Sequence, residues 1–196
     1  VHRATHIARD LSGGEKQRLV LARQLAIGPI VLFADEPTAT LDLGTSRIIE
    51  DSLKNIFKNE GKSLIISSQK TNIIKNVTYS TLLIDNGKLK DKILSKDLIS
   101  GSDTKSTEKD NLSPIQVGDK IIVLDNVKKY YYSISRGVIK AADNISLSIN
   151  EKEIFGIVGK SGSGKTTISK IIGGLIAFKV GEFKLRIGDE WFIMKK

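Results

Sequence analysis

A run of residues toward the C-terminal end of the sequence has the composition of a phosphate-binding loop. The pattern G-x-x-x-x-G-K-[ST] is matched at every fixed position by Gly159, Lys160, Ser161, Gly162, Ser163, Gly164, Lys165 and Thr166. Glycines let the backbone curl so that successive N–H groups point at phosphate oxygens. Lys165 is then expected to reach the terminal phosphates and the Thr166 hydroxyl to ligate Mg²⁺, with Thr167 beside it. The motif therefore predicts a site for ATP and Mg²⁺.

A second anion site is indicated near the other end of the sequence. The segment Leu11-Ser12-Gly13-Gly14-Glu15 opens like a capped helix, and apolar residues follow it at helical spacing. N–H groups at a helix start carry partial positive charge, so Ser12 and the two glycines are suited to a γ-phosphate.

Two acids follow the apolar run Ile30–Ala34, whose length is typical of a strand buried on both faces. Asp35, at the carboxyl end of this strand, can orient a Mg²⁺-bound water. Glu36 is placed to polarise an attacking water, and it is the predicted catalytic residue.

The elements that position these groups alternate between strand and helix, which predicts an α/β fold with a parallel sheet flanked by helices. Further buried strands are predicted at 63–67 and 154–158, and helices at about 12–27, 45–59 and 166–176. Antiparallel pieces are expected at 121–124 and 145–149, and hairpins at 79–91 and 183–194.

Composition excludes several kinds of protein. The sequence has no cysteine, so it holds no disulfide or thiolate metal site, and a reducing cytoplasm is compatible. No apolar stretch approaches the roughly 20 residues that span a bilayer. The net charge of +9 comes from scattered lysines without interleaved aromatics, which makes nucleic acid an unfavoured partner.

Three segments together resemble the ATP-binding cassette family. Leu11–Glu15 is similar to its signature motif, Leu32–Glu36 to its Walker B strand, and the stretch with Asp42 to its D-loop. The resemblance implies a P-loop nucleoside triphosphatase of cassette type with an antiparallel β subdomain. It also implies that the signature residues and Asp42 contact nucleotide. Tyr130, upstream of the phosphate loop, is then a candidate for stacking on the base, with packing in the sheet as an equal alternative.

The order of the motifs is unexpected, because a cassette of this family runs from phosphate loop to signature to Walker B. Here the signature comes first, which predicts parts of two cassettes from a longer tandem protein. Residues 1–91 are interpreted as the C-terminal part of a first cassette, 92–119 as a polar linker, and 120–196 as the N-terminal part of a second. In the family each ATP lies between two cassettes, so Asp35 and Glu36 are expected at a different site from Lys165.

An alternative arrangement is a single, circularly permuted cassette. In it the phosphate-loop strand pairs with the 30–34 strand, and Lys165 lies close enough to Asp35 to share one Mg²⁺.

The family also has a switch histidine that contacts the γ-phosphate after the strand following Walker B. Here that place is held by Gln69, and the histidines of the sequence are His2 and His6. Glutamine can hydrogen-bond a phosphate but cannot carry a proton or positive charge. A slow or degenerate site is expected there.

Two segments are similar to one branch of the family, whose members activate methyl-coenzyme M reductase in methanogenic archaea. These are Tyr131–Ala141 and Arg186–Trp191. This resemblance implies a cytoplasmic ATPase whose partners are the rest of its own tandem cassettes, the reductase and other activation components. Two rival interpretations are the ATP-binding subunit of a transporter and a ribosome- or nucleic-acid-associated cassette protein.

Overall fold

The computed structural model describes residues 9, 11–39, 41–78, 80–94, 118–135 and 137–194. His2, His6, Arg136 and most of the linker predicted at 92–119 lie outside these residues. The order of elements is α1 (Gly13–Ala26), β1 (Val31–Asp35), α2 (Leu43–Glu60), β2 (Ser63–Ser68), α3 (Thr71–Val77), β3 (Ser80–Asp85), β4 (Lys88–Leu94), β5 (Lys120–Ser133), β6 (Gly137–Asn150), β7 (Ile154–Val158), α4 (Lys165–Ile172), β8 (Val180–Ile187) and β9 (Glu190–Met194).

A five-stranded sheet forms the centre, in the order β1-β2-β7-β3-β4. Strands β1, β2, β7 and β3 are parallel, and β4 closes the edge as an antiparallel hairpin with β3. The predicted parallel α/β sheet is thus confirmed. Strands from both ends of the sequence share this sheet, and β7, which leads into the phosphate loop, lies between β2 and β3.

Burial explains which strands are central. All residues of β2 and β7 are buried, whereas β1 is buried only at alternate positions. A strand that is apolar on both faces needs neighbours and cover on each side, so β2 and β7 pair with each other and β1 takes the edge. The permuted arrangement expected direct pairing of β7 with the 30–34 strand. That detail is wrong, because β2 separates them.

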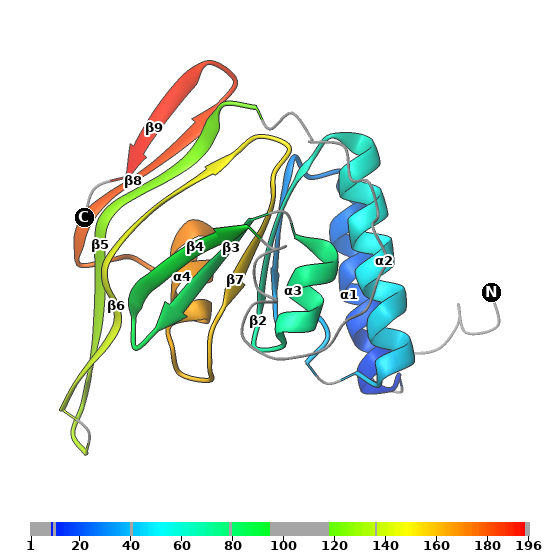
Figure 1. The fold of residues 1–196 in the computed structure, drawn as a ribbon, viewed down its shortest axis with the longest axis horizontal. Coiled ribbons are helices and arrows are strands. Elements are labelled where there is room, and N and C mark those ends of the chain that lie inside the picture. The colour runs from blue at the N-terminus through cyan, green and yellow to red at the C-terminus, as the bar shows by residue number, and fades with distance from the viewer. Residues whose placement is uncertain are drawn as a thin grey trace.

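Two apolar cores lie on the two faces of the sheet. Leu64 and Ile66 of β2 pack with α2 and α3, while Ile65, between them, packs with α4 and the second sheet. This alternation follows from the two-residue period of a strand. Figure 1 shows α4 between the central sheet and the second sheet, with α1, α2 and α3 on the opposite side.

The second sheet is antiparallel, in the order β6-β5-β8-β9. Its β5 and β6 each have 14 residues and form one long hairpin that projects from the body of the molecule (Figure 1). The sequence predicted only the buried pieces of these strands, 121–124 and 145–149. Beyond them the hairpin residues are largely exposed, so no apolar alternation marks their length.

Candidate functional site

The candidate site lies at the carboxyl edge of the central sheet. Asp35, the last residue of β1, is in register with Ser67 of β2, and Ser67 is in register with Ile157 of β7. Because parallel strands end at the same edge, the residues that follow β1, β2 and β7 meet there. Walker B acids, the Gln69 segment and the phosphate loop are therefore neighbours.

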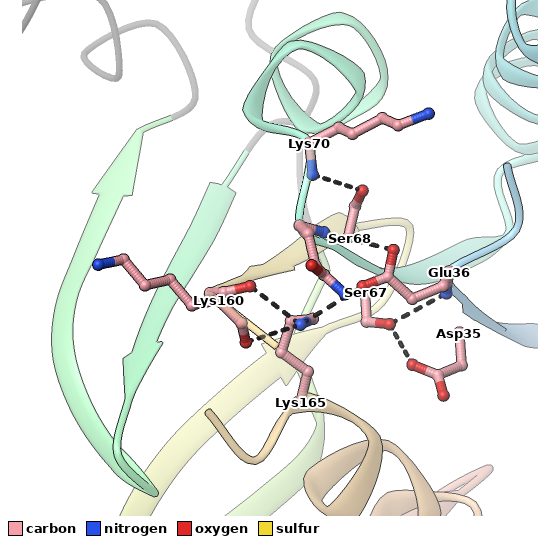
Figure 2. A network of polar contacts seen from close by, with 9 residues as sticks. Asp35, Glu36, Ser67, Ser68, Lys70, Lys160 and Lys165 are labelled. Carbon is pink, nitrogen blue, oxygen red and sulfur yellow. Dashed lines mark hydrogen bonds and ion pairs between the residues drawn. The ribbon is translucent and has the colours of Figure 1, made fainter. Parts of the chain in front are cut away.

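The phosphate loop connects β7 to α4, as the sequence predicts. Its lysine, Lys165, is 5% exposed and donates to the carbonyls of Gly159 at 2.9 Å and Lys160 at 3.2 Å (Figure 2). Ser161 and Thr166 are exposed, while Thr167 is half-buried on α4. The buried lysine is thus held inside its own loop, and the hydroxyl expected to ligate Mg²⁺ is accessible.

Two glycines of the loop have no room for a side chain. A Cβ on Gly159 would lie 2.3 Å from the carbonyl oxygen of Ile84, and one on Gly164 would lie 2.1 Å from that of Ala141. Gly164 also has a φ of 109°, which L side chains rarely adopt. Close backbone approach at both positions keeps the loop curled.

A turn from the other half of the chain supports the loop. Gly87, between β3 and β4, donates its N–H to the carbonyl of Ser163 at 2.8 Å, and its own carbonyl accepts from the Asp143 N–H at 2.7 Å. The Asp85-Asn86-Gly87 signal predicted the turn but not this contact. The phosphate loop is therefore braced by residues distant in sequence.

The loop fits a phosphate group. The Ser163 side chain is 3% exposed, and among the described residues its Oγ has no hydrogen-bond partner. Further hydrogen-bond donors for phosphate oxygens come from the lysine ammonium, the N–H groups at the start of α4 and the N–H groups of the glycines. Thr166 and Asp35 are the residues that would hold Mg²⁺, which typically takes one or two protein oxygens in addition to nucleotide phosphates.

The second acid, Glu36, meets the lysine. Glu36 Oε1 lies 3.3 Å from Lys165 Nζ as an ion pair, with 21% of the Glu36 side chain exposed. Glu36 Oε2 accepts from the backbone N–H of Gln69 at 3.3 Å. The tandem interpretation assigned Glu36 and Lys165 to different sites, whereas the permuted alternative placed Lys165 beside the Walker B acids. The ion pair of Lys165 with Glu36 agrees with the permuted alternative in this respect.

Gln69 contacts this site through its backbone, and its main-chain N–H donates to the Glu36 carboxylate. The hydrogen bond expected from its side chain to a phosphate stays a prediction. The side chain itself is exposed. The following residue, Lys70, caps α3 without a side-chain bond and donates its N–H to Ser68 Oγ at 3.0 Å.

Ser67 joins the two acids and was missed by the sequence analysis. Its hydroxyl donates to Asp35 Oδ1 and accepts from the Glu36 N–H at 3.2 Å (Figure 2). A serine at the end of an apolar strand belongs to no recognisable sequence motif. Its role here follows from the pairing of its strand with β1, which brings it beside the acids.

The signature residues form a separate, open region at the start of α1. Ser12 is the N-cap: its Oγ accepts from the Glu15 N–H at 3.3 Å, and its own N–H donates to Glu15 Oε2 at 2.9 Å. Gly13 begins the helix. Asp42 is the N-cap of α2: its carboxylate accepts from the Thr45 N–H at 2.9 Å, and this bond lowers the pKa of the carboxyl. Both caps agree with the local sequence signals.

An open hollow of about 350 Å³ separates these two helix starts, and we call it the signature hollow. Its lining consists of Ser12, Gly14, Glu15, Arg18, Leu41, Asp42 and Thr45, and Leu11 is half-buried beside Ser12. The sequence-predicted signature and D-loop residues are therefore neighbours. Gln17, on α1, donates to the carbonyls of Glu36 at 3.5 Å and of Pro37, which ties this region to the Walker B loop.

Tyr130 lies on β5 and is half-buried. Its hydroxyl donates to Asp143 Oδ1 at 2.5 Å, and the ammonium groups of Lys140 and Lys179 lie 5.7 and 5.9 Å from its ring centre. The hydrogen bond raises the pKa of Tyr130 and lowers that of Asp143. Since Asp143 also contacts Gly87, hydrogen bonds link the aromatic residue to the phosphate loop.

Known proteins are similar to this chain over most of its length. The profile of the family described as ABC transporter matches residues 1–39 and 142–193. An uncharacterized ABC transporter ATP-binding protein of Methanocaldococcus jannaschii is 45% identical over 200 residues, covering 100% of this chain and 36% of that protein. A putative ABC transporter ATP-binding protein of Methanosarcina acetivorans is 35% identical, covering 89% and 33%.

A third relative has a more specific name. The nucleoside import ATP-binding protein NupA of Lactococcus lactis is 32% identical over 192 residues, covering 93% of this chain and 36% of that protein. The chain thus spans about a third of the length of these relatives. With phosphate loop, signature and Walker B residues joined in one fold, the chain is similar to members of the ATP-binding cassette family over the matched segments.

None of the helices that the structure describes is long and apolar enough to cross a membrane.

Proposed function

We propose that this chain is part of the ATP-hydrolysing subunit of a transporter. The observation that carries the hydrolytic part is the 3.3 Å ion pair between Lys165 Nζ and Glu36 Oε1, which unites the phosphate loop and the Walker B acid at one sheet edge. The transporter part is supported by the names of the relatives, which speak of the ATP-binding proteins of transporters or of nucleoside import.

In this proposal Lys165 supplies positive charge to the terminal phosphates. Its ammonium already has two carbonyl partners and one carboxylate, so it is desolvated and fixed before nucleotide arrives. A preorganised charge of this kind stabilises developing negative charge without reorganisation during the reaction. Glu36 exchanges its ion pair with Lys165 for contact with the attacking water, whose proton its carboxylate accepts.

Asp35 and Thr166 hold the metal in this proposal. When bound, Mg²⁺ neutralises charge on the phosphates. The main-chain N–H of Gln69 keeps the Glu36 carboxylate in place, but its side chain supplies no proton or positive charge. We therefore expect slow turnover.

The signature hollow and Asp42 serve nucleotide held by another cassette in this proposal. The open helix start at Ser12 is accessible to a partner, and the hollow already groups an N-cap serine with Arg18. The boundaries at 1–91, 92–119 and 120–196 then mark successive segments of the sequence, and the first and the last of them build one site together. Relatives about three times as long leave room for complete tandem cassettes.

A second candidate is ATP-dependent activation of methyl-coenzyme M reductase. It depends on the resemblance of two segments, Tyr131–Ala141 and Arg186–Trp191, to the branch of the family that activates the reductase. Relatives from archaea are compatible with this candidate. The names of those relatives favour the transporter, so we place activation second. A cytoplasmic location belongs to this second candidate, while a transporter subunit would lie at the membrane surface.

The test begins with ATP binding and turnover by the wild-type chain and by Glu36→Gln. We expect Glu36→Gln to retain binding while turnover falls about 100-fold or more, as for loss of a general base. Equal turnover by the two proteins would contradict the assignment of Glu36.

A second experiment distinguishes the two candidate partners, the membrane transporter and the reductase. It uses the longest natural protein that carries this sequence. ATP-dependent uptake by vesicles containing its membrane partner would support the transporter. Activation of purified inactive reductase, requiring ATP and Lys165, would support the second candidate instead.

A further inference from the structure

One buried hydroxyl contacts both Walker B acids. Ser67 is 0% exposed and is the register partner of Asp35 across the parallel pair β1–β2. Its Oγ donates to Asp35 Oδ1 and accepts from the backbone N–H of Glu36 at 3.2 Å. The Ser67 carbonyl accepts from the same N–H at 3.1 Å.

The chemistry of serine fits this pair of contacts. A hydroxyl has one hydrogen to donate and two lone pairs that accept. Here the hydrogen goes to a carboxylate, which can only accept when ionised, and a lone pair receives an amide N–H. Neither contact competes with the other, and the buried position excludes water as a substitute partner.

The backbone of Glu36 makes this support necessary. Glu36 has a φ of 47°, in the left-handed region that disfavours residues other than glycine. Its N–H is shared between the carbonyl and the hydroxyl of Ser67, so two acceptors hold the turn that aims its carboxylate at Lys165.

For Asp35 the consequence is an assignment of its two oxygens. The Ser67 hydroxyl takes Oδ1 and fixes the rotation of the carboxylate. Asp35 would then offer Oδ2 to a metal, with the orientation of the carboxylate already set by Ser67. Preorganisation of this kind raises affinity because less freedom is lost on binding.

We propose that Ser67 is a positioning residue that sets the Asp35 carboxylate for Mg²⁺ and the Glu36 backbone for hydrolysis. This inference rests on the proposed function, since it assigns a role within the same site. Ser68, the next residue, offers an internal comparison, because its hydroxyl accepts from the Lys70 N–H and contacts neither acid in the described structure.

The experiment measures ATP affinity by calorimetry with Mg²⁺ and with EDTA, for wild type, Ser67→Thr, Ser67→Val, Ser67→Ala and Ser68→Ala. Threonine and valine have the same shape, so any packing cost in the buried strand is common to both and only the hydroxyl differs. We expect the gain in affinity from Mg²⁺ to be about tenfold smaller in Ser67→Val and Ser67→Ala, which corresponds to loss of one hydrogen bond to a charged group. Affinity in EDTA should be unchanged.

Ser67→Thr and Ser68→Ala should retain the wild-type response to Mg²⁺. If Ser67→Thr and Ser67→Val folded too poorly to measure, the comparison of Ser67→Ala with Ser68→Ala would decide. Equal Mg²⁺ responses across the hydroxyl-bearing and hydroxyl-free variants would overturn the role of Ser67 while the proposed function stood. A wild-type chain whose ATP affinity ignores Mg²⁺ would overturn both.

Discussion

The phosphate loop and the signature region are both helix starts with glycines, yet they are built in opposite ways. The loop is enclosed by distant segments: Gly87, Ala141 and Glu36 all contact it from elsewhere in the chain. The start of α1 is capped by its own residues, Ser12 and Glu15, and α1 has no buried residue. One site is preorganised by the fold, and the other is presented at the surface.

This difference has a functional meaning within the proposal. A site that must bind triphosphate tightly benefits from groups fixed in advance, because little freedom remains to be lost. A site that must meet and leave a partner benefits from exposure and local stability. The two regions should therefore respond differently to substitution.

The largest effect is expected for Lys165→Ala. This substitution removes the buried ammonium that contacts the Gly159 and Lys160 carbonyls and leaves the Glu36 carboxylate without its ion-pair partner. We expect ATP affinity to fall about 100-fold or more, since a charge-assisted contact to phosphate is lost and an unpaired acid faces the same place. Fluorescence titration with a labelled ATP analogue measures the change.

Lys170→Ala provides the matched control, because Lys170 is an exposed lysine on the same helix. The ATP affinity of Lys170→Ala should equal that of the wild-type protein. A Lys165→Ala variant that bound ATP as well as Lys170→Ala would show that the loop lysine does not contact nucleotide.

The next effect concerns the enclosure of the loop and compares two of its glycines. Gly164→Ala should destabilise the fold by about 2–4 kcal/mol, because a methyl group would meet the backbone carbonyl of Ala141 and the φ of 109° is strained. Gly162 also has a positive φ, 76°, but a Cβ added there would meet no atom within 4 Å. Gly162→Ala should therefore cost only about 1 kcal/mol.

Urea denaturation followed by circular dichroism measures both free energies of unfolding. Equal losses for the two variants would mean that the loop is not enclosed by the β6 backbone. The contrast between the two helix starts would then disappear, since both would depend on local conformation alone.

Features built from neighbouring residues could be predicted from the sequence, whereas features built from distant segments could be predicted only in part. The cap at Ser12 and the curl of the phosphate loop depend on residues adjacent in the chain, so motif and spacing indicate them. The helices and strands around them also follow from local periodicity. Helix α3 was missed because it is short and its N-cap, Lys70, makes no side-chain capping bond.

The assembly of the site was predictable only in part, because the permuted alternative placed Lys165 near Asp35 but paired the wrong strands. Strands β2 and β7 are both buried throughout, and such strands look alike in sequence, so their pairing partners are not encoded in any short pattern. The meeting of Glu36 with Lys165, and of Ser67 with Asp35, depends on that pairing. Gly87 likewise indicated a turn, but only the fold showed that the turn contacts Ser163.

At the signature region a smaller and separable effect is expected. Ser12→Ala removes the capping bond to the Glu15 N–H and should destabilise the chain by about 1 kcal/mol. Ser12→Asp should keep stability near wild type, because aspartate caps helices as well as serine does. Its negative charge, however, should oppose an anion at the signature hollow.

Turnover at saturating ATP, measured beside urea denaturation, distinguishes stability from function. We expect Ser12→Asp to turn over ATP more slowly than Ser12→Ala despite its greater stability. If activity instead followed stability, the serine would serve only as a helix cap and the signature hollow would have no role toward nucleotide.

The smallest effect is expected at the Tyr130–Asp143 hydrogen bond, and it depends on pH. The bond lowers the pKa of Asp143, so its contribution to stability is present above the unfolded-state pKa of about 3.9 and is lost as the pH falls through the lower folded-state value. It raises the pKa of Tyr130, so the contribution is present below the unfolded-state pKa of about 10 and is lost as the pH rises through the higher folded-state value.

Tyr130→Phe should therefore be slightly less stable than wild type between these limits, and the two proteins should converge in stronger acid and stronger base. Unfolding free energies from urea titrations across the pH range measure the difference, with Tyr131→Phe, an exposed tyrosine of the same strand, as control. A constant difference at every pH would mean that Tyr130 acts through packing, and the link from the aromatic residue through Asp143 to the phosphate loop would carry no energy.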